Sequence, residues 1–140
     1  MPPLGAADAE ALARSALGVP AAEPADALLV ERLDRAGQAY YLVMFGPPEG
    51  PTAVATVDAT SGAIMNSARL GVRQPHLAVT RERAIELARL REPATVSLVW
   101  CPCRASRSPF SPIWRVAGAS ATVFVDQQGV CWKDLTPTIA

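Results

Sequence analysis

The spacing in this sequence that most suggests chemistry is Cys101-Pro102-Cys103. In an extended strand the thiols of residues i and i+2 point to the same face, as in a redox pair or half of a metal site. Zinc sites usually need a second such pair or two histidines. The chain offers only one further cysteine, Cys131, and one histidine, His76. We therefore interpret the pair as small apolar core side chains and predict no metal site.

No set of side chains predicts catalysis. His76 lies between the two halves of the chain, and a general base needs a nucleophile or carboxylate placed beside it. Ser61 is not part of a G-x-S-x-G nucleophile motif. Glu82 and Glu86 are four residues apart with Arg89 following, which is typical of solvated ion pairs on a helix. We therefore expect a protein that is not an enzyme and binds no cofactor.

A recognition surface is the more plausible site, because residues 100–115 combine arginines with aromatic side chains in and around a Pro/Ser-rich loop, 102–112. Trp, Tyr and Arg are enriched where proteins bind one another, and loops often carry recognition. The candidate binding residues are Trp100, Arg104, Arg107, Phe110, Trp114 and Arg115. In the alternative interpretation, both tryptophans are core residues of neighbouring strands and Phe110 fastens the loop.

Composition narrows the classes of partner. The chain has 140 residues, of which 50% are hydrophobic and 19% charged, so it can form a globular core. Thirteen basic and thirteen acidic residues cancel, which argues against a nucleic-acid partner even though arginines could contact phosphates. We expect a protein partner, with neither nucleic acid nor membrane, and homodimerisation as an option if a strand edge is unpaired.

Compartment follows from the termini and the cysteines. The sequence contains no run of about 18 apolar residues, so it predicts no membrane-spanning helix. The first residues lack the basic and apolar regions of a signal peptide. An odd number of cysteines suits a reducing compartment. The expectation is therefore a cytoplasmic location, or an extracytoplasmic one if a signal peptide had been removed.

Periodicity predicts two helices. Apolar residues at 9, 12, 13, 16 and 17 form one face of a helix over 8–17, with Asp8 as N-cap and Gly18 after its end. A second helix is expected over 80–91, with Thr80 as N-cap and Pro93 as its stop.

Strand-like runs follow each predicted helix. In two places an aspartate closes one run and a glycine precedes the next, Asp58 with Gly62 and Asp126 with Gly129, which indicates hairpins. The expected strands are 28–33, 39–45, 53–58, 63–70, 95–101, 113–117, 121–126 and 130–135.

Each half therefore has the same order of elements, which predicts an internal duplication. The expected fold class is α+β, with two α-β-β-β-β repeats, each a helix packed on an antiparallel sheet. The repeats would span 1–72 and 78–140 and form one compact unit.

An Ala-rich helix, then aromatic strands, then a hairpin closed by Val-Asp and a glycine resemble the PepSY domain. The residues that carry the resemblance are 9–18, 40–45 and 57–62 in the first half, and 80–90, 114–116 and 125–129 in the second. It implies a helix on an antiparallel sheet and a non-catalytic role, because PepSY domains are associated with protease propeptides and are thought to bind or inhibit peptidases. They are commonly extracytoplasmic, whereas this chain shows no export signal.

The sequence thus predicts a non-enzymatic binding or regulatory module, PepSY-like, that binds a protein or regulates a peptidase. The alternative is a small apolar ligand held between helix and sheet by Tyr40, Val43 and Phe45. An enzyme ranks last for want of converging polar groups.

Overall fold

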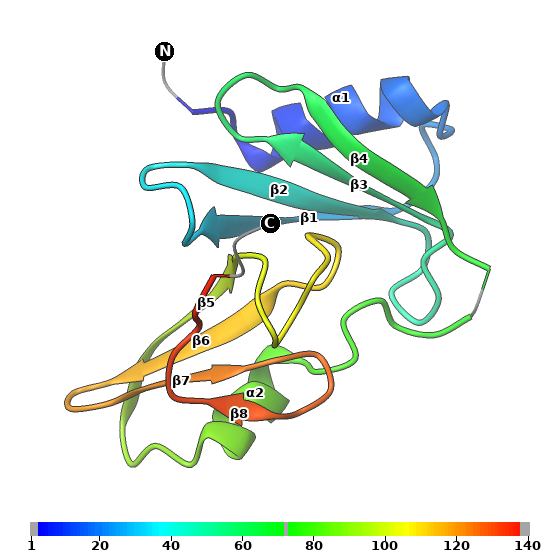
Figure 1. Cartoon of the computed structure of the whole chain (residues 1–140). Helices are drawn as coiled ribbons and strands as arrows, with labels where there is room; N and C mark the ends of the chain where they lie inside the picture. The colour runs from blue at the N-terminus through cyan, green and yellow to red at the C-terminus, as the bar shows by residue number, and fades with distance from the viewer. Residues whose placement is uncertain (1–2, 72, 138–140) are drawn as a thin grey trace. The chain divides into compact units, whose positions relative to one another are not determined.

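The computed structural model describes residues 3–71 and 73–137 and contains two helices and eight strands (Figure 1). In chain order these are α1 (Ala6–Leu17), β1 (Ala25–Arg32), β2 (Ala39–Phe45), β3 (Ala53–Asp58), β4 (Ile64–Arg69), α2 (Arg81–Ala88), β5 (Pro93–Trp100), β6 (Ile113–Gly118), β7 (Thr122–Val125) and β8 (Cys131–Trp132). The fold is α+β, and each pair of strands whose register is defined is antiparallel.

The predicted fold of two repeats, each with its own antiparallel sheet, is wrong. The strands belong to one eight-stranded sheet in the order β4-β3-β2-β1-β5-β6-β7-β8. Turn chemistry predicts which strands are hairpin neighbours, because a turn is determined by a few adjacent residues. The sequence pattern does not specify which strand follows β1 or β5, the first strands of the two hairpin series, in the sheet.

The chain divides into two compact units. Unit 1 contains the residues up to Glu31 together with Gly37–His76, and unit 2 contains Arg32–Ala36 together with the residues from Leu77 onward. The short segment after β1 is thus grouped with the second half of the chain, where the N–H of Leu33 donates to the carbonyl of Trp100 (3.0 Å).

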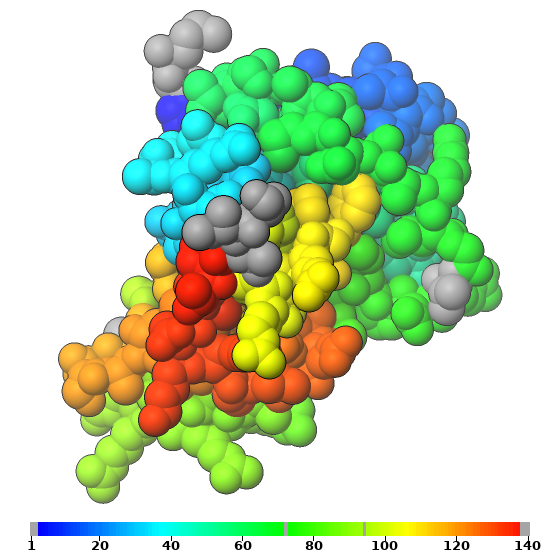
Figure 2. Space-filling view, viewed as in Figure 1, coloured from blue at the N-terminus to red at the C-terminus, as the bar shows by residue number. Residues whose placement is uncertain are grey.

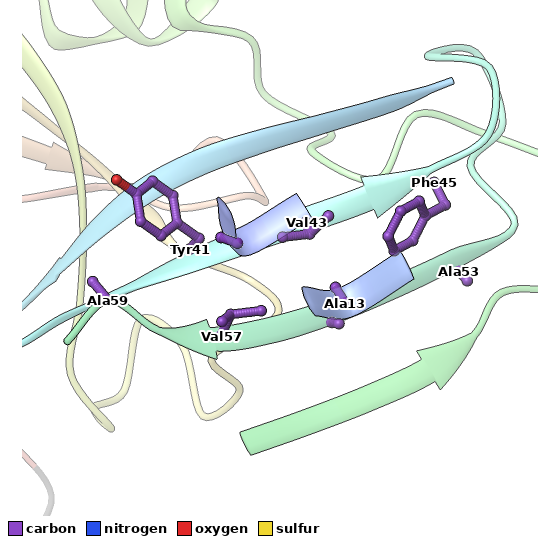
Figure 3. Packing of buried hydrophobic residues seen from close by; sticks show 9 residues of the cluster. Ala13, Tyr41, Val43, Phe45, Ala53, Val57 and Ala59 are labelled. Carbon is purple, nitrogen blue, oxygen red and sulfur yellow. The ribbon is translucent and has the colours of Figure 1, made fainter. Parts of the chain in front are cut away.

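In unit 1, α1 packs on β2, β3 and β4. Ala9 and Ala13 of the helix are buried against apolar side chains of the two central strands (Figure 3). These side chains belong to Tyr41, Val43 and Phe45 of β2, to Ala53, Ala55 and Val57 of β3, and to Ala59 directly after β3. The small alanines let the helix lie close to the sheet, and the large side chains that are fully buried in this cluster come from the strands.

The helix α1 begins two residues before the predicted start. Gly5 is the N-cap, and the Asp8 carboxylate accepts a hydrogen bond from the Gly5 N–H (3.3 Å), so Asp8 caps the helix from its first turn. Gly18 ends the helix in the left-handed conformation, as predicted, with φ at 67°.

In unit 2, α2 packs on β5, β6 and β7. The predicted cap is present, because the Thr80 hydroxyl accepts a hydrogen bond from the Arg83 N–H (3.1 Å). The helix ends at Ala88, earlier than predicted, because Arg89 takes the left-handed conformation that favours termination. Pro93 begins β5 instead of stopping the helix.

The two units contain the same hydrogen-bonded connection in front of the helix. In unit 1 the Tyr41 hydroxyl donates to the carbonyl of Leu4, two residues before α1 (2.8 Å). In unit 2 the Trp114 indole donates to the carbonyl of Val79, two residues before α2 (2.8 Å). An aromatic residue of a central strand thus fixes the entry to each helix.

Candidate functional site

The loop 102–112 joins β5 to β6 and begins with a tight turn. The backbones of Cys103 and Ser106 exchange two hydrogen bonds, at 3.0 and 3.2 Å, which leaves Arg104 and Ala105 at the tip. Ala105 packs against the buried cluster below the turn, whereas Arg104 points its side chain into solvent. The turn is therefore held by both backbone bonds and packing.

The hydroxyl of Ser106 connects this turn to the rest of the loop. It accepts a hydrogen bond from the Trp100 indole (3.2 Å) and lies 2.7 Å from the carbonyl oxygen of Ser111 and 3.1 Å from that of Ser108. A hydroxyl has one proton to donate, and the shorter distance favours Ser111. The start and the end of the loop are thereby joined through one side chain.

The far end of the loop is fixed by Gln127, from the turn after β7. Its amide nitrogen donates to the carbonyl of Pro112 (2.9 Å), and its amide oxygen accepts from the Val79 N–H (2.9 Å). Within the loop, the Ser108 hydroxyl accepts from the Phe110 N–H (3.2 Å). The loop is long, but its course is set by hydrogen bonds at both ends and in the middle.

Arg104 and Arg107 are the exposed cations of this loop. Neither forms a hydrogen bond or an ion pair with any residue in the described ranges. A depression of about 350 Å³ contains both, and its lining is Arg104, Ala105, Ser106, Arg107, Ser108, Ser111, Gln127 and Gln128. The guanidinium groups are therefore available to an outside ligand.

A second depression lies on the other side of Arg104, between the loop and the C-terminal segment. It measures about 200 Å³ and is lined by Cys103, Arg104, Ala105, Trp132, Asp134, Leu135 and Thr136. In Figure 2 the first part of the loop (yellow) lies at the surface beside this segment (red). Arg104 thus borders both hollows, and only the smaller one includes a carboxylate.

The six predicted binding residues do not form one surface. Trp100 and Trp114 are only 6% and 8% exposed, so both belong to the core, as the alternative interpretation has it. Arg115 is half-buried on β6, where its Nε donates to the Ser97 hydroxyl (3.3 Å). Phe110 is half-buried in the loop. Arg104 and Arg107 alone remain as exposed candidates.

Sequence reasoning missed the residues that hold Trp100. The Arg32 guanidinium lies over its ring, 5.1 Å from the centroid, and pairs with Asp34 through bonds of 3.0 and 2.8 Å. The hydrogen bond from Arg32 lowers the pKa of the Asp34 carboxyl. Because the folded state holds this carboxyl in its ionised form, Asp34 stabilises the fold at pH values above 3.8, the usual pKa of the group. This contribution is lost as the pH falls through the lowered pKa. The ion pair could have been predicted from the spacing of Arg32 and Asp34. The contact with Trp100 could not, because Trp100 is distant in the sequence.

The cysteine pair lies in the core of unit 2. Cys101 and Cys103 are buried together with Val99 and Ile113. Burial, with the adjacent Cys103 as the next cause, raises the pKa of the Cys101 thiol to about 12. Nucleophilic attack and metal binding both need the thiolate, which this environment disfavours. Among the residues that the structure describes, no three or more potential metal ligands cluster.

Thiol reactivity tests this assignment. With the native chain at pH 8, iodoacetamide is expected to modify the exposed Cys131 quickly and leave Cys101 unmodified, as measured by peptide mass spectrometry. A urea-unfolded sample is the control, in which all three react. Equal rates at Cys101 in native and unfolded chain would contradict the buried assignment.

The same raised pKa has a consequence at high pH. Because the unfolded thiol ionises near its usual value of 9.0 and the folded one only near about 12, the unfolded state loses its proton first. The contribution of this thiol to the stability of the fold is complete below pH 9.0 and is lost as the pH rises from 9.0 to about 12.

The alternative pocket between helix and sheet is not formed by the three residues named for it. Val43 and Phe45 are buried against α1. Tyr40 precedes Tyr41 on β2, and successive strand residues point to opposite faces, so Tyr40 faces away from this helix.

Comparison with known proteins gives little further guidance. No family model matches the chain, and no curated protein matches it either. The chain is similar to the solved structure of a protein described as a "putative lipoprotein" from Clostridium difficile 630, with 13% identity, a TM-score of 0.39, and 93% of this chain and 91% of that chain covered. A similarity this low supports no argument about function. Neither described helix is long and apolar enough to cross a membrane.

Proposed function

We propose that this chain is a non-enzymatic protein-binding module that recognises its partner through the loop 102–112. The observation that carries the proposal is the pair of exposed guanidinium groups of Arg104 and Arg107, which have no partner among the described residues. Arginine is among the residues that contribute most to protein–protein binding. A loop whose conformation is already fixed loses little entropy when it binds.

The chemistry of the larger depression supports binding over catalysis. Its lining contains no carboxylate, histidine or cysteine side chain that could transfer a proton or attack a substrate. The polar groups of Ser106, Ser108 and Gln127 are already engaged in holding the loop. Arg104 and Arg107 take no part in these hydrogen bonds within the loop.

The resemblance to PepSY domains extends the proposal to the class of partner, a peptidase that this chain would bind or regulate. We also propose that the two halves arose by internal duplication. The matching bonds from Tyr41 to Leu4 and from Trp114 to Val79 favour it, since both place an aromatic donor on the carbonyl two residues before a helix.

A comparative pull-down tests the binding function. The purified chain is expected to capture a protein from a lysate of its source organism, and Arg104→Ala/Arg107→Ala is expected to lose it. Arg83→Ala/Arg91→Ala is the matched control, because it removes the same charge from exposed positions of unit 2. Arg91 borders the opposite end of the β5–β6 hairpin from the loop.

Circular dichroism first checks that all three chains are folded, and the captured protein is then purified and titrated directly. If the wild type and both variants capture the same proteins in the same amounts, the loop is not the recognition element.

A further inference from the structure

The depression around Arg104 and Arg107 contains four side chains that form no hydrogen bond with the described residues. They are the two guanidinium groups, the Ser111 hydroxyl and the side-chain amide of Gln128, and none of them is hydrogen-bonded to any part of the chain that is described. These four side chains come from two segments, the loop and the turn after β7. Of their neighbours in the same lining, Ser106 and Gln127 donate hydrogen bonds to the loop, and the Ser108 hydroxyl accepts one. Free donors are therefore concentrated at one place.

The charge of this depression is positive and uncompensated. Arginine stays protonated at any pH that the fold experiences. The nearest carboxylate in the two hollows, that of Asp134, lines the smaller one and is not within ion-pair distance of Arg104. A guanidinium group presents a planar fork of N–H donors, which matches the paired oxygens of a carboxylate or a phosphate.

Size and donor geometry limit what can bind. Pockets for whole small-molecule ligands run from roughly 300 to 1,000 Å³. At about 350 Å³ this depression is near the lower limit, which suits one or two side chains of a peptide. Its lining residues other than Ala105 are polar or charged, and the two arginines supply the positive charge that favours an anionic side chain.

We propose that this depression is an oxyanion site that binds a carboxylate or phosphate group on a peptide segment of the partner. The proposal rests on the protein-binding function above and specifies its chemistry. Arg104 and Arg107 supply the charge, and Ser111 and Gln128 supply neutral donors to the remaining oxygen lone pairs. An acidic or phosphorylated peptide would therefore bind, whereas its neutral counterpart would not.

Fluorescence anisotropy with short labelled peptides tests the proposal. One peptide has two adjacent glutamates between glycines and serines, the second has glutamines in their place, and the third has one phosphoserine. At physiological salt, the glutamate or the phosphoserine peptide is expected to bind at least about tenfold more tightly than the glutamine peptide, because charge-assisted hydrogen bonds are about twice as strong as neutral ones. The stronger of the two identifies the source of the oxyanion, and free inorganic phosphate serves as competitor.

The variants separate the site from general charge attraction. Arg104→Ala/Arg107→Ala should abolish the preference for the charged peptide, and Arg83→Ala/Arg91→Ala should keep it. Ser111→Ala/Gln128→Ala keeps both charges and should weaken binding by a few-fold, a change that long-range attraction alone would not produce. If the glutamine peptide binds equally well, or if both arginine pairs contribute equally, there is no oxyanion site.

The two proposals fail in different ways. If no peptide shows a charge preference while the pull-down still depends on Arg104 and Arg107, the oxyanion site is wrong and the binding module stands. If the pull-down does not depend on these arginines, the binding module is wrong whatever the peptides do.

Discussion

Replacing Phe45 by alanine is expected to lower the free energy of unfolding by about 3–5 kcal/mol. Phe45 lies at the end of β2, is fully buried and packs in the cluster beneath α1. The fully buried residues that the helix contributes to this cluster are Ala9 and Ala13, with Leu17 only partly buried against it, and the opposite strand residue, Ala53, is also small. Small residues that are fixed in a helix and in a strand cannot refill the space left by the ring, so part of the cavity would persist. The ring is also lost as a partner for the Arg14 guanidinium, 5.3 Å from its centroid.

Urea denaturation monitored by circular dichroism measures this effect. Leu29→Ala on β1 is the control, since Leu29 is 54% exposed and loses little contact on truncation. Its expected change is within about 0.5 kcal/mol, as for most surface positions. Equal losses in the two variants would mean that α1 does not seal a core in unit 1.

Replacing Asp126 by alanine is expected to cost about 3 kcal/mol, the second largest effect. Asp126 is only 5% exposed, and its carboxylate accepts three hydrogen bonds. Two come from the backbone N–H groups of Gln128 and Val130, both at 2.9 Å, and the third comes from the Trp132 indole at 3.0 Å. Alanine leaves the three partly buried donors without this acceptor, and the turn loses the side-chain bond that joins it to Trp132 of β8.

Asp58 provides the matched comparison, because it occupies the corresponding turn of unit 1. Its carboxylate accepts from the N–H groups of Thr60 and Ser61 at 2.8 and 2.7 Å, but Asp58 itself is only half-buried, whereas Asp126 is buried. Water can replace the lost acceptor there, so Asp58→Ala should cost about 1 kcal/mol. Thermal unfolding, together with hydrogen exchange of the Trp132 indole, distinguishes the two variants. A loss at Asp58 as large as that at Asp126 would contradict the assigned role of burial.

Local chemistry made the hairpins predictable. Asp58 and Asp126 both bond to the backbone of the turn that follows them, and Gly62 and Gly129 both take positive φ, at 77° and 82°. Such turns are determined within a few residues, so the sequence contains the information needed. Strands 39–45 and 53–58 were predicted with the observed bounds. The strand predicted over 130–135 is shorter in the structure, where β8 contains only Cys131–Trp132. How far an edge strand pairs with its neighbour depends on the neighbour, which is the four-residue β7.

Long-range partners were not predictable. The order of the strands in the sheet places β5 next to β1, and no residue pattern of either strand specifies this order. The candidate site contained one error that strand geometry could have prevented. Trp114 and Arg115 are neighbours on β6 and must point to opposite faces, so they could not share a binding surface with each other. Arg32 and Gln127 became relevant only through tertiary contacts with Trp100 and Pro112.

The bonds of Gln127 determine how far this loop can be moved in protein engineering. Its amide links the end of the loop at Pro112 to the residue before the α2 cap, Val79. Residues 102–112 grafted onto another scaffold would keep their internal Ser106 bonds but lose this outside support. A transplant that keeps the arginines in place must therefore carry Gln127 and an equivalent of the Val79 N–H. The unit that can be exchanged is the loop together with the β7–β8 turn.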